Sequence, residues 1–177
     1  MNDSLLPVIY LGTLVTLLSV AAIVLIRQIF KTRRVEGTFN QLQRKLTKEK
    51  GTSQEYYELG GILLDKKLYS QAIAQFQKAL KSKDLQGGEN IALIHNALGY
   101  AYAAQEQFDL AIRQYKEALE QKPDYVTALN NLAFAYEKKQ LTAQALETYE
   151  TALQHDPKNP TATRRAASLR KRFAPST

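Results

Sequence analysis

The sequence predicts an all-α protein, in which a stack of three helical hairpins follows one apolar N-terminal helix. Two observations predict this architecture. Large and small residues recur at a period of 34 in the second half of the chain, which is typical of arrays of paired helices. A long segment near the N-terminus also lacks charged residues, as expected of a helix that crosses a membrane.

The N-terminal segment carries no charged residue from Ser4 to Ile26. As a helix it would be about 35 Å long, enough to cross the roughly 30 Å hydrocarbon core of a bilayer. We therefore predict a transmembrane helix over residues 8–27, after a short non-cytoplasmic N-terminus over residues 1–7. A cleaved secretory signal is the alternative. It is disfavoured because no positive charge precedes the apolar core and no cleavage site follows it closely.

Positive charge follows this segment at once, whereas Asp3 is the only charged residue before it. The positive-inside rule therefore places the rest of the chain in the cytoplasm or in the stroma of a plastid. Residues 28–52 are predicted to form a basic amphipathic linker, whose apolar stripe would contact lipid, the repeats or a second chain. Four basic residues are expected at the membrane surface: Arg27, Lys31, Arg33 and Arg34.

The repeated pattern is clearest in its last two copies, where small residues allow two helices to approach closely and large ones fill their interface. The residues Leu98, Gly99, Tyr102, Ala111, Tyr115, Ala118 and Pro123 return as Leu132, Ala133, Tyr136, Ala145, Tyr149, Ala152 and Pro157. A looser copy comes before them, at Leu59, Gly60, Leu63, Ala72, Phe76 and Ala79. An insertion near Gly87 separates it from the second copy.

These residues resemble the consensus of the tetratricopeptide repeat (TPR) family. The resemblance implies a right-handed superhelix of three helix–turn–helix repeats, over residues 53–86, 92–125 and 126–159. A helix over residues 160–173 is expected to cap the last repeat; a basic docking tail is the alternative. Asp124 and Asn159 are predicted to be the N-caps of the helices that follow them. The cap helix would bury an apolar stripe: Ala162, Ala166, Leu169 and Phe173.

In TPR arrays the first helix of each repeat lines a concave groove, so the resemblance implies a protein-binding groove in this chain. Asn96 and Asn130 lie one repeat apart, and their carboxamides would hold a peptide backbone. The aromatic rings would contact apolar side chains of the client; alternatively, some of these rings pack between repeats. The expected groove residues are Tyr57, Leu64, Asn96, Tyr100, Asn130, Phe134 and Lys138.

The clamp with which TPR co-chaperones hold acidic C-termini is missing from the sequence. The positions of its lysine, asparagine and arginine residues hold Tyr57, Gly61, Ala97, Thr127 and Asn131. A receptor for the C-termini of chaperones is therefore disfavoured.

No pattern in the sequence indicates an enzyme, a cofactor or a metal site. Cysteine is absent, two histidines occur, and no phosphate-binding, dinucleotide or hydrolase motif is found. His95 is expected to be a packed structural residue. The net charge of +7 lies on the two flanks of a mildly acidic repeat region, so nucleic-acid binding is not expected.

The arrangement of one membrane span, a basic linker, three repeats and a short basic helix resembles that of the small membrane-anchored TPR proteins of cyanobacteria and plastids, which promote photosystem I assembly or stability. The likeness includes the Arg-Gln-x-x-Lys-Thr-Arg-Arg stretch at residues 27–34. It implies a single-pass protein of the thylakoid or cytoplasmic membrane, which contacts lipid through its span and binds photosystem I subunits or assembly intermediates. A general membrane-tethered adaptor for secretion, pilus or division machinery is the alternative.

Overall fold

The computed structural model describes residues 5–173, which contain eight helices and no strand. This description leaves out the side chains of Leu5, Leu6, Val8, Ile9, Lys31 and Phe173. The predicted burial of Phe173 and the predicted position of Lys31 at the membrane surface therefore lie outside the described residues. The first four residues of the predicted N-terminus over 1–7 also lie outside it. The chain divides into two units, Met1–Arg44 and Lys45–Thr177.

The first unit is made by the long helix α1 (Leu5–Lys48), which ends a few residues into the second unit. This helix covers the predicted span and continues without a break through Gly37 into the basic segment. All side chains from Tyr10 to Phe30 are exposed. In length and composition the helix is sufficient to cross a membrane.

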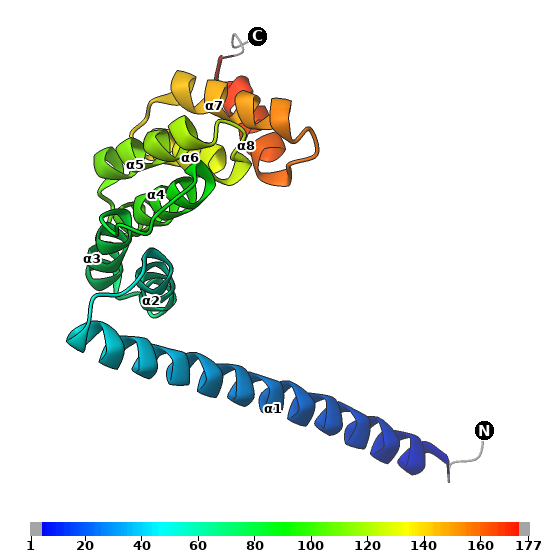
Figure 1. The fold of residues 1–177 in the computed structure, drawn as a ribbon. Helices are drawn as coiled ribbons and strands as arrows, with labels where there is room; N and C mark the ends of the chain where they lie inside the picture. The colour runs from blue at the N-terminus through cyan, green and yellow to red at the C-terminus, as the bar shows by residue number, and fades with distance from the viewer. Residues whose placement is uncertain (1–4, 174–177) are drawn as a thin grey trace. The chain divides into compact units, whose positions relative to one another are not determined.

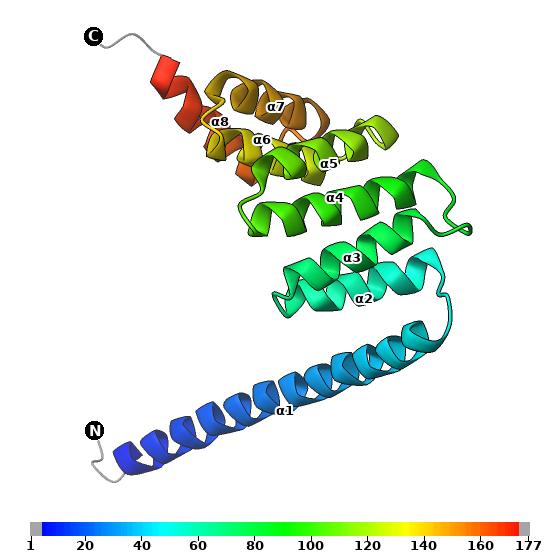
Figure 2. The same cartoon turned by 90° about the vertical axis from the view of Figure 1, so that its left-hand side faces the viewer.

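The second unit contains three helical hairpins and a final helix, and each helix packs against the next one along the chain. The hairpins therefore stack in chain order, as Figures 1 and 2 show. This arrangement confirms the predicted TPR solenoid. The hairpins are α2 (Ser53–Asp65) with α3 (Tyr69–Leu80), α4 (Gly88–Ala104) with α5 (Phe108–Gln121), and α6 (Val126–Lys138) with α7 (Thr142–His155); α8 (Pro160–Phe173) follows.

Glycine in the first helix of a hairpin makes room for an aromatic ring from the second helix. A Cβ atom on Gly60 would lie 2.5 Å from Cε1 of Phe76, and one on Gly99 would lie 2.6 Å from Cε1 of Tyr115. Both rings are fully buried. In the first two hairpins the glycine therefore sets the distance between the paired helices, because a side chain at its position would push the ring away.

The two helices of each hairpin are joined by a three-residue turn whose middle residue is left-handed. Lys67, Glu106 and Gln140 have φ values of 60°, 59° and 61°. After each of them, a backbone N–H donates back to a carbonyl of the first helix, as from Leu68 to Leu63 at 2.8 Å. This bond satisfies one of the carbonyls that a helix end leaves free, so all three turns end the first helix in the same way.

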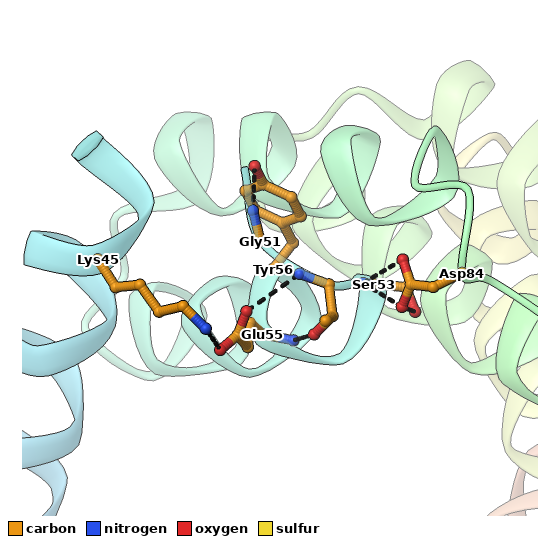
Figure 3. A network of polar contacts seen from close by, with 7 residues as sticks. Lys45, Gly51, Ser53, Glu55, Tyr56 and Asp84 are labelled. Carbon is orange, nitrogen blue, oxygen red and sulfur yellow. Dashed lines mark hydrogen bonds and ion pairs between the residues drawn. The ribbon is translucent and has the colours of Figure 1, made fainter. Parts of the chain in front are cut away.

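Polar contacts fix the start of the repeat stack, as Figure 3 shows. Thr52 and Glu55 form a capping box, in which Oγ1 of Thr52 accepts from the Glu55 N–H at 3.2 Å and the Glu55 carboxylate accepts from the Thr52 N–H at 3.0 Å. Lys45 forms an ion pair with Glu55. Asp84, from the loop between α3 and α4, accepts from the Ser53 N–H and hydroxyl, each at 2.9 Å.

The C-terminal helix covers the end of the stack with its apolar side. Ala162, Ala166 and Leu169 are buried. Asn159 caps this helix as predicted, since its Oδ1 accepts from the Ala162 N–H at 3.0 Å. The prediction for Asp124 is wrong: Tyr125 occupies the capping position of α6 and makes no side-chain capping bond, because a turn bonded from the Tyr125 N–H to the Lys122 carbonyl precedes the helix.

Candidate protein-binding groove

Two adjoining hollows follow the first helices of the repeats. The N-terminal hollow encloses about 520 Å³ and is lined by Leu64, Asp65, Lys67, Tyr69, Asn96, Ala97, Tyr100, Thr127 and Asn131. The C-terminal hollow encloses about 310 Å³ and is lined by Thr127, Asn130, Asn131, Phe134, Tyr149, Thr161, Arg164 and Arg165. Because Thr127 and Asn131 line both hollows, the two form one groove across α2, α4, α6 and α8.

Two aromatic rings provide the apolar surface of this groove. Tyr100 is 51% exposed and Phe134 is 37% exposed, and they occupy equivalent positions in α4 and α6. Leu64 lies beside Tyr100 in the N-terminal hollow. Large apolar side chains that remain exposed in a row are typical of a surface that another molecule covers. An extended peptide that follows the groove would meet one ring in each hollow.

The asparagine side chains of the groove bond to one another and to neighbouring repeats. Asn131 donates from Nδ2 to Oδ1 of Asn96 at 3.0 Å, and Asn130 donates to Oδ1 of Asn159 at 3.1 Å. Asn96 in turn donates to the Tyr125 hydroxyl at 3.4 Å. Of these carboxamide atoms, Oδ1 of Asn130 is buried and has no hydrogen-bond partner within the described residues. The capture of a peptide backbone by Asn96 and Asn130 stays a prediction.

The two remaining predicted groove residues lie just outside the hollows. The ring of Tyr57 packs against that of Phe76, with centroids 5.8 Å apart. This contact agrees with the alternative in which some aromatic rings pack inside the repeat stack and do not contact a client. Lys138 places its Nζ 5.4 Å from the centroid of the Phe134 ring, and the Arg165 guanidinium lies 6.0 Å from the same centroid. Both distances permit cation–π attraction.

Sequence reasoning missed the contribution of α8 to the groove. Thr161, Arg164 and Arg165 line the C-terminal hollow, whereas α8 was expected to shield the last repeat, with a basic docking tail as the alternative. The 34-residue period gives no register for a helix outside the repeats. The signal was nevertheless present, because Asn159 and Pro160 fix where α8 begins and these three residues lie on one side of a helix that starts there.

The C-terminal hollow is positively charged. Arg164 and Arg165 line it, and no carboxylate does. Glu137 contacts two of the lining residues: it accepts from the Tyr149 hydroxyl at 2.7 Å and lies 3.6 Å from Nη1 of Arg165. Burial raises the pKa of Tyr149, so its hydroxyl stays protonated at physiological pH. In the N-terminal hollow, by contrast, the charge of Lys67 is matched by Asp65.

Among the described residues outside the groove, His95 makes a contact inside the repeat stack. Nδ1 of His95 lies 2.9 Å from Oε1 of the buried Gln114, which fits a structural histidine. Within residues 5–173, no group of His, Cys, Asp and Glu side chains is placed to hold a metal ion. On α1, the predicted surface residues Arg27, Arg33 and Arg34 are exposed.

Comparison with known proteins identifies the repeats. Models of the "Tetratricopeptide repeat" match residues 56–84 and 126–159, and a model described as "TPR repeat" matches residues 99–140. Among solved structures, the TPR domain of Arabidopsis OM64 has a TM-score of 0.62 at 23% identity and covers 68% of this chain and 95% of that one. YrrB, a TPR protein with an unusual peptide-binding site, has a TM-score of 0.67 at 20% identity over 81% and 71% of the chains.

Curated relatives match more of the sequence than the repeat models do. The chain is 44% identical to the uncharacterised protein ycf37 of Cyanophora paradoxa over 108 residues, which are 61% of this chain and 62% of that protein. It is 35% identical to ycf37 of Guillardia theta over 72% of each chain. It is also 35% identical to the chloroplast TPR protein PYG7 of Arabidopsis thaliana, over 70% of this chain and 40% of PYG7. The match thus spans less than two thirds of the Cyanophora and Arabidopsis proteins.

Proposed function

We propose a function from one premise: the chain belongs to the family of tetratricopeptide-repeat proteins that includes ycf37 and the chloroplast protein PYG7. In this proposal it is a membrane-anchored scaffold that binds protein clients and promotes the assembly or stability of photosystem I at the thylakoid membrane. The photosystem I role follows from its resemblance to plastid and cyanobacterial assembly factors, and the chloroplast location of PYG7 supports it.

The groove is the observation that carries the binding function. It offers an exposed ring in each of its two hollows, at Tyr100 and Phe134. The hydrogen bond from Asn131 to Asn96 joins α6 to α4 and already orders both carboxamides, so little of their side-chain freedom would be lost when a client binds. A related fold, the first TPR domain of RPAP3, has been solved with an HSP90 peptide, and peptide binding is what we propose for this groove.

The apolar part of α1 supports a membrane anchor. Its side chains are exposed along the whole stretch from Tyr10 to Ile26, and such a surface is favourable in lipid and unfavourable in water. Exposed arginines follow at Arg27, Arg33 and Arg34, where they would contact headgroups on the cytoplasmic or stromal side. An anchor confines the groove close to membrane-bound clients and so raises its effective concentration.

Affinity purification of the intact chain tests this function. A tagged protein recovered from solubilised photosynthetic membranes should enrich photosystem I subunits. Substitution of both exposed rings, Tyr100→Ala with Phe134→Ala, should abolish the enrichment because the groove loses its apolar contacts. Leu110→Ala is the matched control, since Leu110 is 38% exposed on α5 and does not line either hollow.

Other results would contradict the proposal. Enrichment of secretion, pilus or division components in place of photosystem I subunits would favour the general adaptor. Equal recovery of photosystem I subunits by the double variant and by the unchanged chain would show that the groove is not the client site. Circular dichroism of the variant should verify that its helices are retained.

A further inference from the structure

The two hollows of the groove differ in charge. Arg164 and Arg165 line the C-terminal hollow, and no carboxylate lines it. Glu137 pairs with Arg165 at 3.6 Å, whereas Arg164 has no acidic partner among the described residues. In the N-terminal hollow, Asp65 offsets the charge of Lys67. A client segment that follows the groove therefore passes from a neutral into a positive environment. Charge complementarity requires an anionic group at the C-terminal end.

The chemistry of the C-terminal hollow fits a carboxylate on a short apolar stem. Arginine donates in a planar fork that matches a carboxylate. The pair between Arg165 and Glu137 is long, at 3.6 Å, and that arginine keeps 40% of its side chain exposed. Arg164 is exposed and forms no ion pair among the described residues. The partly exposed ring of Phe134 lines the same hollow and would cover the methylene groups of the bound side chain.

From these observations we infer that the C-terminal hollow binds an acidic side chain of an extended client peptide, with Arg164 and Arg165 as its donors. This inference rests on the proposed function, since it specifies the client of the same groove. It differs from the clamp of TPR co-chaperones, whose positions in this chain hold uncharged residues. Here the cations come from the helix that follows the last repeat.

A polypeptide suits this surface better than a lipid headgroup does. The positive hollow continues, through the shared residues Thr127 and Asn131, into a neutral hollow with an exposed ring at Tyr100. A chain that alternates apolar and polar side chains can occupy both hollows. A headgroup would fill only the positive one and leave the remaining apolar surface uncovered.

Selection from a random peptide library tests the inference. The intact chain, held in a neutral detergent, would be used to select peptides, and the affinity of the selected peptides would be measured. We expect aspartate or glutamate to be enriched at one position. The variant Arg164→Gln with Arg165→Gln should bind these peptides about tenfold or more weakly, because it loses hydrogen bonds to a charged group. Added salt should weaken binding to the unchanged chain more than binding to the variant.

The control variant is Lys171→Gln with Arg172→Gln, which removes the same charge from exposed positions of α8 that do not line the hollow. It should bind the selected peptides as tightly as the unchanged chain. If the selected peptides are not enriched in aspartate or glutamate, the inference is overturned and the binding function stands. The same conclusion follows if the hollow variant and the control variant lose peptide affinity equally. If no peptide is selected, both proposals fail. The inference would also be overturned if the Arg164→Gln, Arg165→Gln variant binds phosphatidylglycerol vesicles more weakly than the unchanged chain but binds peptides equally well. The hollow would then be a lipid site.

Discussion

Gly60 lies directly against the ring of Phe76, so that a Cβ atom at this position would come within 2.5 Å of the ring. Phe76 is completely buried. The neighbouring Gly61 has no atom within 4 Å of the place where its Cβ would lie. Two adjacent glycines of one helix therefore have different roles, because only the first is required by packing.

Gly60→Ala should lower the free energy of unfolding of the repeat stack by about 1–3 kcal/mol, the usual cost of forcing a group into a filled core. Gly61→Ala is the control and should raise it by about 0.5–1 kcal/mol, since alanine is the better helix former. Urea denaturation followed by circular dichroism measures both. Equal effects of the two substitutions would mean that the hairpin does not pack as closely as described.

The turn between α4 and α5 offers a stabilising substitution. Glu106 has a φ of 59°, a conformation that costs a residue with a Cβ atom about 1 kcal/mol. Glu106→Gly should therefore raise the melting temperature, whereas Glu106→Ala should not. A melting temperature that falls with glycine would contradict the left-handed geometry of this turn.

The bond between Asp84 and Ser53 should make the start of the stack sensitive to acid. Hydrogen bonds from the Ser53 backbone N–H, and secondarily from its hydroxyl, lower the pKa of Asp84 below its ordinary value. A carboxyl group with a lowered pKa stabilises the folded state fully above the unfolded pKa of about 3.9, and this contribution is lost as the pH falls through the folded pKa.

Asp84→Asn should therefore unfold at a lower urea concentration than the unchanged chain at pH 7. The difference between the two proteins should shrink when the pH is lowered below about 4. A difference in stability that does not change with pH would show that the charge of Asp84 is unimportant. Asp109→Asn serves as the control, because Asp109 is an exposed surface carboxylate that pairs with Lys139 at 3.0 Å.

Removal of residues 1–34 should release the chain from membranes. The second unit begins at Lys45, so its helices should keep their circular dichroism signal and melting temperature after the deletion. Fractionation of cell membranes measures the release. A truncated chain that stays with the membrane, or one that fully restores photosystem I levels, would contradict an anchoring role for α1.

The 34-residue period was sufficient to predict the solenoid, because small residues such as Gly99 and large ones such as Tyr115 recur, as Ala133 and Tyr149, where paired helices interlock. The resemblance to TPR arrays, whose first helices line the groove, singled out Leu64, Asn96 and Tyr100, which line one hollow, and Asn130 and Phe134, which line the other. What these side chains bind stays a prediction.

Features outside the period could not be predicted in the same way. The arginines of α8 were not placed in the groove, because that helix is not part of a repeat. The hydrogen bonds from the asparagines to Tyr125 and Asn159 depend on how one repeat lies on the next. The start of α4 at Gly88, ahead of the expected start of the second repeat at residue 92, shows that the inserted residues partly extend a helix.

Photo-crosslinking from the groove tests most directly whether the anchored repeats hold a client. A photoreactive amino acid would replace Phe134 in the intact chain, and the same group in place of the equally exposed Leu110 would serve as the control. After irradiation of photosynthetic membranes, we predict crosslinks to a photosystem I subunit from position 134 and none from position 110. The absence of a crosslink from position 134, or the same crosslinks from both positions, would contradict the account.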